Sequence, residues 1–368
     1  MNQGRFFIYM RFYFLIILSF FIYTASFSQV APFQDYSGYF NTFYKGNVRS
    51  LELQRINSFQ AGDNLVAYID NRGNFKVYNG ETVEQISIQE VSFKNSDYLL
   101  AWKIGSGIFS YDHGVKKMLT AFGGDFIVTD SLIVYQDTRF KTLNVLYRGE
   151  IIQLMQQTGE MSMPESVGEN IIAFKDNGDV YRVFWCGKLY ELGGSSMEIA
   201  FNAGTDIVCF NDAINKTFAV FDKGTFIDVE SMYMKKYKSG RGFVVYEDLS
   251  GNLWKYQNGN KMNLTNFCSG IWEVKDDLVI WNENALMYSI YLDEKVQITN
   301  YLPVRYSLKN KTFAYKNNNG GVTVFINGKN TTLTNQIDND FIIYGNSVLV
   351  ELFNKSFLYF SEGKLIQN

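Results

Sequence analysis

The strongest constraint on the fold is a hairpin-like motif that recurs along the chain. The stretch LVAYIDNRGNFKVYNG at residues 65–80 joins two apolar runs through Asp-Asn-Arg-Gly, and similar stretches begin at residues 171 and 243. Nine copies of the first run align, and their aromatic position reads Tyr68, Trp102, Tyr135, Phe174, Phe210, Tyr246, Trp281 and Tyr315, with Glu351 in the ninth copy. Successive copies lie 33 to 39 residues apart. This period predicts a repeat architecture in which each unit buries its apolar surface against its neighbours.

Each repeat has a second landmark, a turn residue that closes a hairpin. Glycine fills this place in eight units, as Gly80, Gly114, Gly149, Gly187, Gly224, Gly259, Gly328 and Gly363, and Asp293 marks it in the unit that lacks glycine. Glycine accepts positive φ angles without steric cost, which suits tight hairpin turns. One unit is therefore predicted to contain four short strands. In the first complete unit these are residues 57–60, the apolar run, FKVYN and TVEQIS.

The predicted strands differ in polarity in a consistent order. Second strands such as LIVY and FVVY are apolar on both faces and therefore need cover on both sides. Fourth strands such as VKKML and KNTTL alternate or become polar, as expected of a partly solvated sheet edge. A sheet with this profile, stacked between copies of itself, is a propeller blade. We predict an all-β fold, a single β-propeller of about nine four-stranded units of about 35 residues, within a range of about eight to ten units.

Two other architectures fit the pattern less well. A transmembrane barrel would suit an exported, aromatic-rich chain, but its strands need roughly 9 to 11 alternating residues. The strands here span five or six residues, and the most apolar of them do not alternate. A parallel β-helix would need a shorter coil and no hairpin glycines.

The repeats resemble those of TolB-type and related WD-like propellers. Units such as LVIWNENALMYSIYLDEKVQITN and FVVYEDLSGNLWKYQNGNKMNLTN carry the aromatic-x-Asp type of strand end, a Tyr-containing third strand and a closing Leu/Ile-Thr. The closing pair occurs at residues 119–120, 264–265, 298–299 and 333–334. The resemblance covers nearly all of residues 35–368, and the Ser-Pro-Asp-Gly turn of that family is absent from every unit. It implies a propeller fold, export and a role as an interaction platform.

Residues 1–28 are interpreted as a secretory signal. Arg5 and Arg11 precede the apolar stretch 12–23, and small residues at 26 and 28 are placed for cleavage before Gln29. An uncleaved membrane anchor is the alternative, but an apolar stretch of about twelve residues falls short of the roughly 20 needed to span a bilayer. The predicted organisation is a signal at 1–28 and one propeller domain at 29–368, with no stable membrane span after cleavage. The expected location is the periplasm or the outside of the cell.

Composition narrows the class of protein further. Apolar residues make up 46% of the chain and charged residues only 19%, which argues against disorder. Removing Arg5 and Arg11 from the 34 basic residues leaves 32 against 37 acidic ones, a formal charge of −5 that argues against nucleic-acid binding. Cys186, Cys209 and Cys268 form neither a disulfide framework nor a CxxC metal motif, and one bridge among them stays open.

Five carboxylates recur at the end of the second strand and form the only candidate rim site: Asp70, Asp137, Asp176, Asp212 and Asp248. In a ring of blades they would lie towards one rim, where they could bind a cation or a substrate. A residue that recurs from unit to unit is better explained by a need of every unit. We therefore predict that each Asp accepts hydrogen bonds from its own turn.

Other candidate chemistry is weaker, and no catalytic, cofactor or metal site is predicted. Asp176, Asn177 and Asp179 alternate oxygen ligands in the style of a calcium loop, but the bidentate Glu of such a loop is absent. His113 is the single histidine, so a multi-histidine metal centre is excluded, and we expect a polar turn residue. The basic stretch MKKYKSGRG at residues 234–242 could bind an anion, although a solvated strand and turn is expected.

The two chain ends are expected to meet. Residues 35–53 match only the second half of a unit and are expected to lack the apolar second strand, while residues 338–368 form the least regular unit. An unpaired sheet edge is a liability, so the N-terminal half-unit is predicted to pair with or pack on the C-terminal unit, or to form a truncated tenth blade.

The predicted function is non-catalytic binding of a protein or glycan of the cell envelope by a monomeric scaffold. The alternative is a propeller enzyme, a lyase or glycoside hydrolase, that uses carboxylates and tyrosines at the central channel. Convergence of such side chains in one axial pocket would favour the enzyme. A broad exposed aromatic patch on one face would favour the scaffold.

Overall fold

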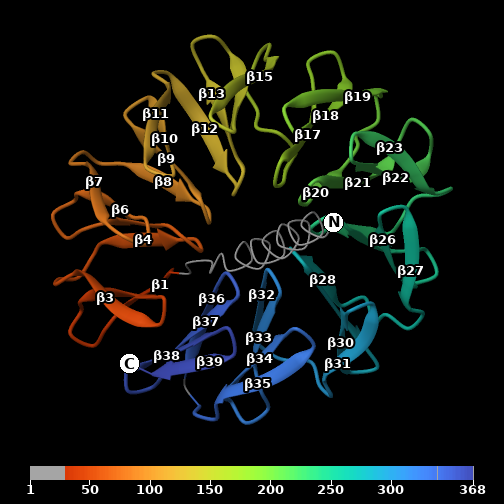
Figure 1. Cartoon of the computed structure of the whole chain (residues 1–368). Helices are drawn as coiled ribbons and strands as arrows, with labels where there is room; N and C mark the ends of the chain where they lie inside the picture. The colour runs from red at the N-terminus through yellow and green to blue at the C-terminus, as the bar shows by residue number, and fades with distance from the viewer. Residues whose placement is uncertain (1–29, 338, 368) are drawn as a thin grey trace, which may run out of the picture.

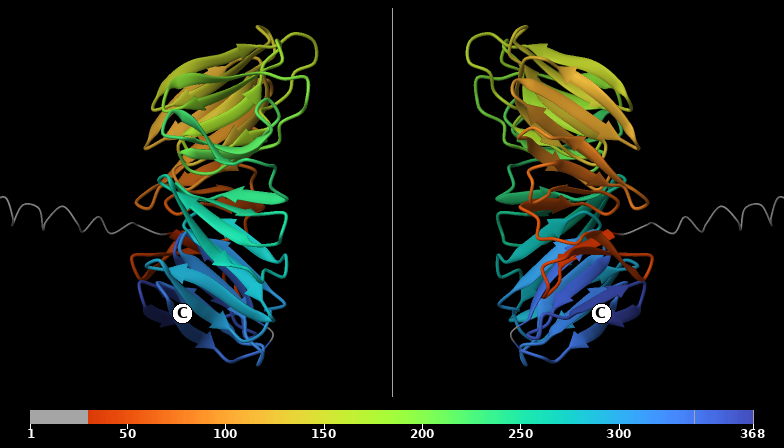
Figure 2. Two further views of the ribbon diagram at one scale, coloured as in Figure 1. Left: turned by 90° about the vertical axis from the view of Figure 1, so that its right-hand side faces the viewer. Right: turned by 90° about the vertical axis from the view of Figure 1, so that its left-hand side faces the viewer.

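The computed structural model describes residues 30–337 and 339–367, which form ten antiparallel sheets arranged as blades around a central channel (Figure 1). Nine blades have four strands in chain order from the innermost to the outermost, and the first blade has three. Seen from the side in Figure 2, the blades form a flat ring. The prediction of a single propeller with four-stranded units is confirmed, and ten blades fall within the predicted range.

The blades follow one another without exchange of strands. The first contains β1 (Val30–Gln34), β2 (Phe40–Tyr44) and β3 (Asn47–Glu52). Blades two to five contain β4 (Ser58–Ala61), β5 (Val66–Ile69), β6 (Phe75–Tyr78), β7 (Val83–Ser87); β8 (Ser92–Asn95), β9 (Leu99–Ile104), β10 (Gly107–Asp112), β11 (Val115–Thr120); β12 (Gly123–Val128), β13 (Leu132–Asp137), β14 (Thr142–Tyr147), β15 (Glu150–Gln156); and β16 (Ser166–Val167), β17 (Ile171–Lys175), β18 (Val180–Trp185), β19 (Lys188–Gly194).

Blades six to ten repeat the same order. They contain β20 (Phe201–Ala203), β21 (Ile207–Asp212), β22 (Thr217–Asp222), β23 (Thr225–Glu230); β24 (Lys236–Ser239), β25 (Val244–Glu247), β26 (Leu253–Gln257), β27 (Asn260–Thr265); β28 (Trp272–Lys275), β29 (Leu278–Glu283), β30 (Leu286–Tyr291), β31 (Glu294–Thr299); β32 (Tyr306–Lys309), β33 (Thr312–Lys316), β34 (Val322–Ile326), β35 (Lys329–Thr334); and β36 (Asp340–Tyr344), β37 (Ser347–Glu351), β38 (Phe357–Ser361), β39 (Lys364–Gln367).

The connections fall on two opposite faces of the ring because successive strands run antiparallel. The turns between first and second strands and between third and fourth strands share one face, which we call the turn face; Asp63 and Gly80 lie there. The connections between second and third strands and the links between blades share the other, which we call the link face; Asp70 and Ile88 lie there.

The hydrophobic core lies between the blades. In β17, Ile171 and Ala173 pack into the cluster shared with the sixth blade, while Ile172 and Phe174 pack into the cluster shared with the fourth blade. Alternate residues of a strand point to opposite faces of its sheet, so a second strand between two blades must be apolar on both. Each of the ten interfaces between neighbouring blades has a cluster of this kind.

The hairpins between third and fourth strands explain why glycine recurs at the same position of the repeat. Gly114 has a φ of 86°, and Asp293 takes the same left-handed conformation, at 60°, in the unit without glycine. Asp tolerates this region better than most residues do. In every blade but the last, the register between third and fourth strands also shifts by a bulge, which the sequence pattern did not predict. Bulges increase the local twist of a sheet.

Two details of the sequence analysis are wrong at the chain ends. The first unit does not lack its apolar second strand, because β1 supplies it; the missing strand is the innermost one. In the last unit the residue at the aromatic position is Val350, which pairs with Phe341, and Glu351 is the next residue along.

The first blade packs directly on the tenth. The rings of Phe33 and Phe357 lie 4.4 Å apart, those of Phe43 and Tyr359 stack at 4.8 Å, and the Tyr344 hydroxyl donates to the Pro32 carbonyl at 3.3 Å. The proposed signal, residues 1–28, lies outside the described residues. Within the described part of the chain, no helix is long and apolar enough to cross a bilayer.

Candidate functional site

The structure places the five predicted rim carboxylates on the link face, each in a different blade, and each binds its own turn. Asp70 Oδ1 accepts the Arg72 and Asn74 N–H groups, both at 2.9 Å, and Asp248 Oδ1 accepts those of Ser250 and Asn252 at 2.8 and 2.9 Å. Asp137, Asp176 and Asp212 make equivalent contacts. Sequence reasoning missed two further members of this set, Asp35 and Asn317. They were missed because the first lies outside the aligned run and the second is an amide.

The surroundings of Asp70 lower the pKa of its carboxyl group. Burial raises the pKa of Asp70, but hydrogen bonds from Asn74 and Lys76 outweigh this effect, and the pKa falls to about 2. The ionised carboxylate is thus stabilised by groups of its own blade.

Replacing Asp137 with Ala should lower the free energy of unfolding by about 1 kcal/mol, because the Arg139 and Phe140 N–H groups and the Thr120 hydroxyl lose their acceptor. Urea denaturation would measure the loss. Asp137→Asn is the matched control, since Asn317 performs the same role in the ninth blade and the variant should lose less. Unchanged stability of Asp137→Ala would contradict a structural role.

The calcium-loop residues are already paired with protein groups. Asp176 Oδ2 lies 2.8 Å from Arg182 Nε, and Asp179 Oδ1 lies 2.7 Å from Lys175 Nζ. Throughout residues 30–337 and 339–367, no cluster of three or more His, Cys, Asp or Glu side chains could hold a metal ion.

The remaining candidates are also dispersed. His113 is exposed in a hairpin turn at a φ of 46° and contacts only the neighbouring carboxylate of Asp112 among acidic groups. The basic stretch spans the ring from face to face, with Lys235 paired to Glu247 and Arg241 paired to Asp277, so it forms no single cationic patch. The three cysteines are free thiols, and Cys209 is buried.

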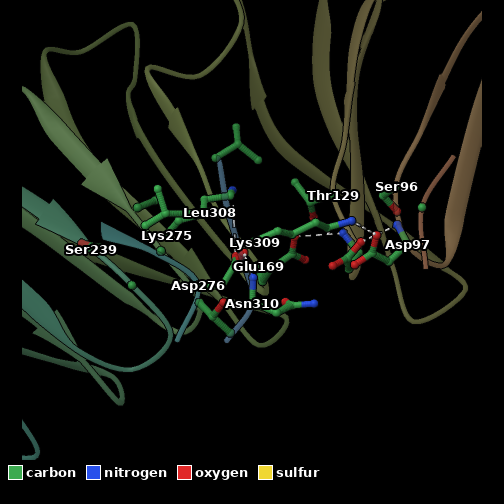
Figure 3. Close-up of a pocket in the computed structure, with 18 of the residues that line it drawn as sticks. Ser96, Asp97, Thr129, Glu169, Ser239, Lys275, Asp276, Leu308, Lys309 and Asn310 are labelled. Atoms are coloured by element: carbon green, nitrogen blue, oxygen red, sulfur yellow. Dashed lines mark hydrogen bonds and ion pairs between the residues drawn. The ribbon is translucent and has the colours of Figure 1, made fainter. Parts of the chain in front are cut away.

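The central channel brings together residues that sequence reasoning did not connect. Its cavity of about 490 Å³ is lined by all nine blades that possess an innermost strand (Figure 3). At the turn face, nine turns form a narrow hub, and four of them in sequence carry Asp63, Asp97, Asp130 and Glu169. A further hollow of about 330 Å³ opens at this mouth.

The hub carboxylates link each turn to the next. Asp97 Oδ1 accepts the Asp63 N–H at 3.0 Å, Asp130 Oδ1 accepts the Asp97 N–H at 2.7 Å, and Glu169 Oε1 accepts the Asp130 N–H at 3.0 Å. In the following blades, backbone carbonyls take over this role, as Gly240 does for Thr205. A Cβ on Gly168 would overlap the carbonyl of Gly204, so only glycine allows this approach.

Lys309 connects the two sides of the seam between the first and last blades. It ends β32 in the ninth blade, and its Nζ lies 3.1 Å from Asp63 Oδ1 of the second blade. The same Nζ lies 2.8 Å from Asp97 Oδ1 of the third blade (Figure 3). Burial lowers the pKa of Lys309, but attraction to both carboxylates outweighs it, so the net shift is upward. Lys309 is therefore charged at neutral pH.

Carboxylate side chains outnumber cationic ones at the turn-face end of the channel. Burial and the neighbouring Asp97 raise the pKa of Asp63 to about 6. Burial, Asp97 and Glu169 raise that of Asp130 to about 7. Both groups favour folding while protonated, and this contribution is lost as the pH rises from about 4 through these values.

Asp130→Asn should therefore raise the thermal midpoint more at pH 8, where the native carboxylate is charged, than at pH 5. The amide keeps an oxygen for the Asp97 N–H. Melting curves of both proteins across this pH range would show whether their difference grows with pH. A difference independent of pH would contradict the assignment.

The link face carries most of the exposed apolar side chains. Among the described connections between strands, every exposed large apolar residue except Leu292 lies on this face. The set spans the ring and comprises Tyr36, Tyr39, Leu53, Ile88, Phe122, Phe140, Met197, Ile214, Met232, Tyr233, Leu249, Phe267, Ile271, Leu302, Val304, Ile337 and Phe353. Sequence reasoning missed it because these residues follow no common register. The available signal was apolar residues within predicted loops.

The comparisons with known proteins agree with the architecture. The family described as "10-bladed beta propeller domain" matches residues 24–365, and the chain belongs to this family. No curated protein matches the chain.

Solved structures show only a low likeness. The computationally designed Ika8 protein is 15% identical over 76% of this chain and 98% of that chain, with a TM-score of 0.33. Hsv2p of Kluyveromyces lactis is 11% identical over 66% and 97%, at 0.31. The CRINKLY WD40 ectodomain of the Arabidopsis thaliana receptor kinase ACR4 is 9% identical over 65% and 98%, also at 0.31. These likenesses carry no argument about function.

Proposed function

We propose that this protein is an exported, non-catalytic scaffold that binds a protein or glycan of the cell envelope through its link face. The observation that carries the proposal is the asymmetry of exposed apolar side chains between the two faces. Leu249 and Phe267, for example, are each 68% exposed on the link face, whereas Leu292 stands alone among the described turns of the other face.

Binding a partner removes exposed apolar side chains from water, which stabilises the complex. The residues sit in connections held by rigid blades, which is where binding residues are commonly placed. The set mixes aliphatic with aromatic side chains, and the buried core of a protein–protein interface contains both kinds. The mixture supports a protein partner more strongly than a glycan.

Export rests on the signal-like residues 1–28 and on the resemblance to TolB-type repeats. Mass spectrometry of the protein isolated from cells should find Gln29 as its first residue. A chain that retains residues 1–28 would instead support the anchored alternative.

Charged substitutions would test the binding face. Leu249→Glu combined with Phe267→Glu should abolish capture of envelope proteins by the immobilised protein, while Leu292→Glu, the matched control on the turn face, should leave capture unchanged. Equal capture by both variants, or none by the wild type, would refute the proposal.

A second candidate function is carboxylate catalysis at the hub. The observation that favours it is Asp130, whose pKa of about 7 suits a general acid or base, beside the hollow at the channel mouth. Against it, each hub carboxylate from Asp97 to Glu169 already accepts a turn N–H. Hydrolysis or lysis of envelope polysaccharides by the wild type, abolished in Asp130→Asn, would favour the enzyme.

A further inference from the structure

Within residues 30–337 and 339–367, the first blade has three strands and no innermost one. A cavity of about 500 Å³, which we call the wedge, lies on the link face between the tenth, first and second blades, where an innermost strand of the first blade would run. Its walls include Pro32 and Gln34 of β1, Phe59 of β4, and Phe341 and Ile342 of β36. The wedge is closed at the turn face, because the turn of the second blade touches that of the tenth. The contact is so close that a Cβ on Gly345 would overlap the Asp63 carboxylate.

The other blades show which side chain suits this position. In seven blades an aromatic residue of the innermost strand pairs with one of the second strand nine residues later: Phe59–Tyr68, Phe93–Trp102, Phe126–Tyr135, Phe201–Phe210, Tyr237–Tyr246, Trp272–Trp281 and Tyr306–Tyr315. Cross-strand aromatic pairs stabilise a sheet. Phe33 is the equivalent second-strand residue of the first blade, because it pairs with Asn41 as Tyr68 pairs with Lys76. Among the described strands, no innermost strand faces Phe33.

The inner edge of β1 is open only at its link-face end. Backbone groups of an edge strand point alternately towards its neighbour and away from it. Those of Val30, Pro32 and Gln34 point away from β2, since the Val30 N–H donates to the Asp63 carbonyl and the Pro32 carbonyl accepts from Tyr344. Pro32 has no N–H, so it prevents a long strand from pairing here. Gln34, which lines the wedge, is left to pair with an added segment.

We propose that the wedge binds an extended peptide segment of a partner protein, which pairs with the backbone at Gln34 and inserts an aromatic side chain beside Phe33. This inference deepens the proposed function and rests on it. The wedge opens on the link face, so the segment would extend the same binding surface. A short extended peptide adding to a sheet edge gains affinity from main-chain hydrogen bonds and specificity from one pocket.

The probe is a fluorescein-labelled peptide NSFQAGD, which copies residues 57–63 of the second blade. It should bind the protein produced from the full-length sequence, and the matched peptide NSAQAGD should bind at least about tenfold more weakly, since the aromatic group is absent. Equal binding of the two peptides, or binding of neither, would overturn the proposal.

Two variants separate the wedge from the rest of the link face. Ile342→Glu places a charge in the wedge at a side chain that is 50% exposed and should abolish peptide binding. Ile88→Glu, at a residue 76% exposed on the link face, is the control and should retain it. If Ile342→Glu still binds peptide, the wedge is not the site. The capture experiment with Leu249 and Phe267 would then still decide the proposed function on its own.

Competition by laminarihexaose for peptide binding would also overturn the proposal. A wild-type chain that retains residues 22–28 and does not bind the peptide would do the same, because those residues would then occupy the wedge.

Discussion

Deleting residues 29–53 should abolish cooperative folding. The deletion removes the first blade and with it two of the clusters that join neighbouring blades. On one side Phe357 and Tyr359 lose Phe33 and Phe43, and on the other Tyr68 loses Phe40, whose ring lies 5.1 Å away. Two apolar blade faces would then meet water and tend to associate with other chains.

Circular dichroism during heating and size-exclusion chromatography would measure the effect. The expected result is a broad transition or none, together with aggregates. Phe33→Ala is the control, because it weakens the seam but keeps the blade, and it should lower the melting temperature while preserving a single transition. A deleted protein that remains monomeric and melts sharply would show that ring closure does not depend on the first blade.

Trp281→Ala should have the largest effect of any single substitution considered, about 3 to 5 kcal/mol of unfolding free energy. Trp281 is 0% exposed in β29 and packs between the seventh and eighth blades. It is the cross-strand neighbour of Trp272 and stacks with Tyr288 at 6.0 Å. The substitution would leave a cavity that the surrounding sheets cannot close, since blades on both sides hold their positions.

Chemical denaturation of wild type and variant gives this difference directly. Trp281→Phe is the matched control: it keeps an aromatic ring in the interface and should lose considerably less. A loss below about 1 kcal/mol for the Ala variant would mean that the interface repacks and that the core between blades is looser than the structure indicates.

The blade could be predicted because its requirements repeat. Second strands such as β17 are covered on both faces, so their apolar character shows in the sequence, and the turn at Asp293 obeys the same φ requirement as the glycines. The first blade was misread for a local reason. β1 contains Pro32 and directly follows the proposed signal, so it did not look like a second strand.

The candidate sites could be predicted only in part. The Asp residues of the link-face turns recur in type, and the pattern identified all of them except Asp35. The residue type at the hub positions changes from Asp63 through Glu169 and Thr205 to Arg241. Only their place is constant, two residues before the aligned apolar run of each unit. The contact between Lys309 and Asp63 spans 246 residues and depends on ring closure, so no local pattern could indicate it.

In the described part of the chain, the first and last blades share no sheet. The ring is therefore joined at this point by side chains, by the Tyr344–Pro32 hydrogen bond and by the ion pairs of Lys309, without a backbone ladder. The ring is thus closed by a non-covalent interface. Under a pulling force or in mild denaturant, this interface should separate before any blade unfolds. The protein could then open into a curved array of intact blades and close again.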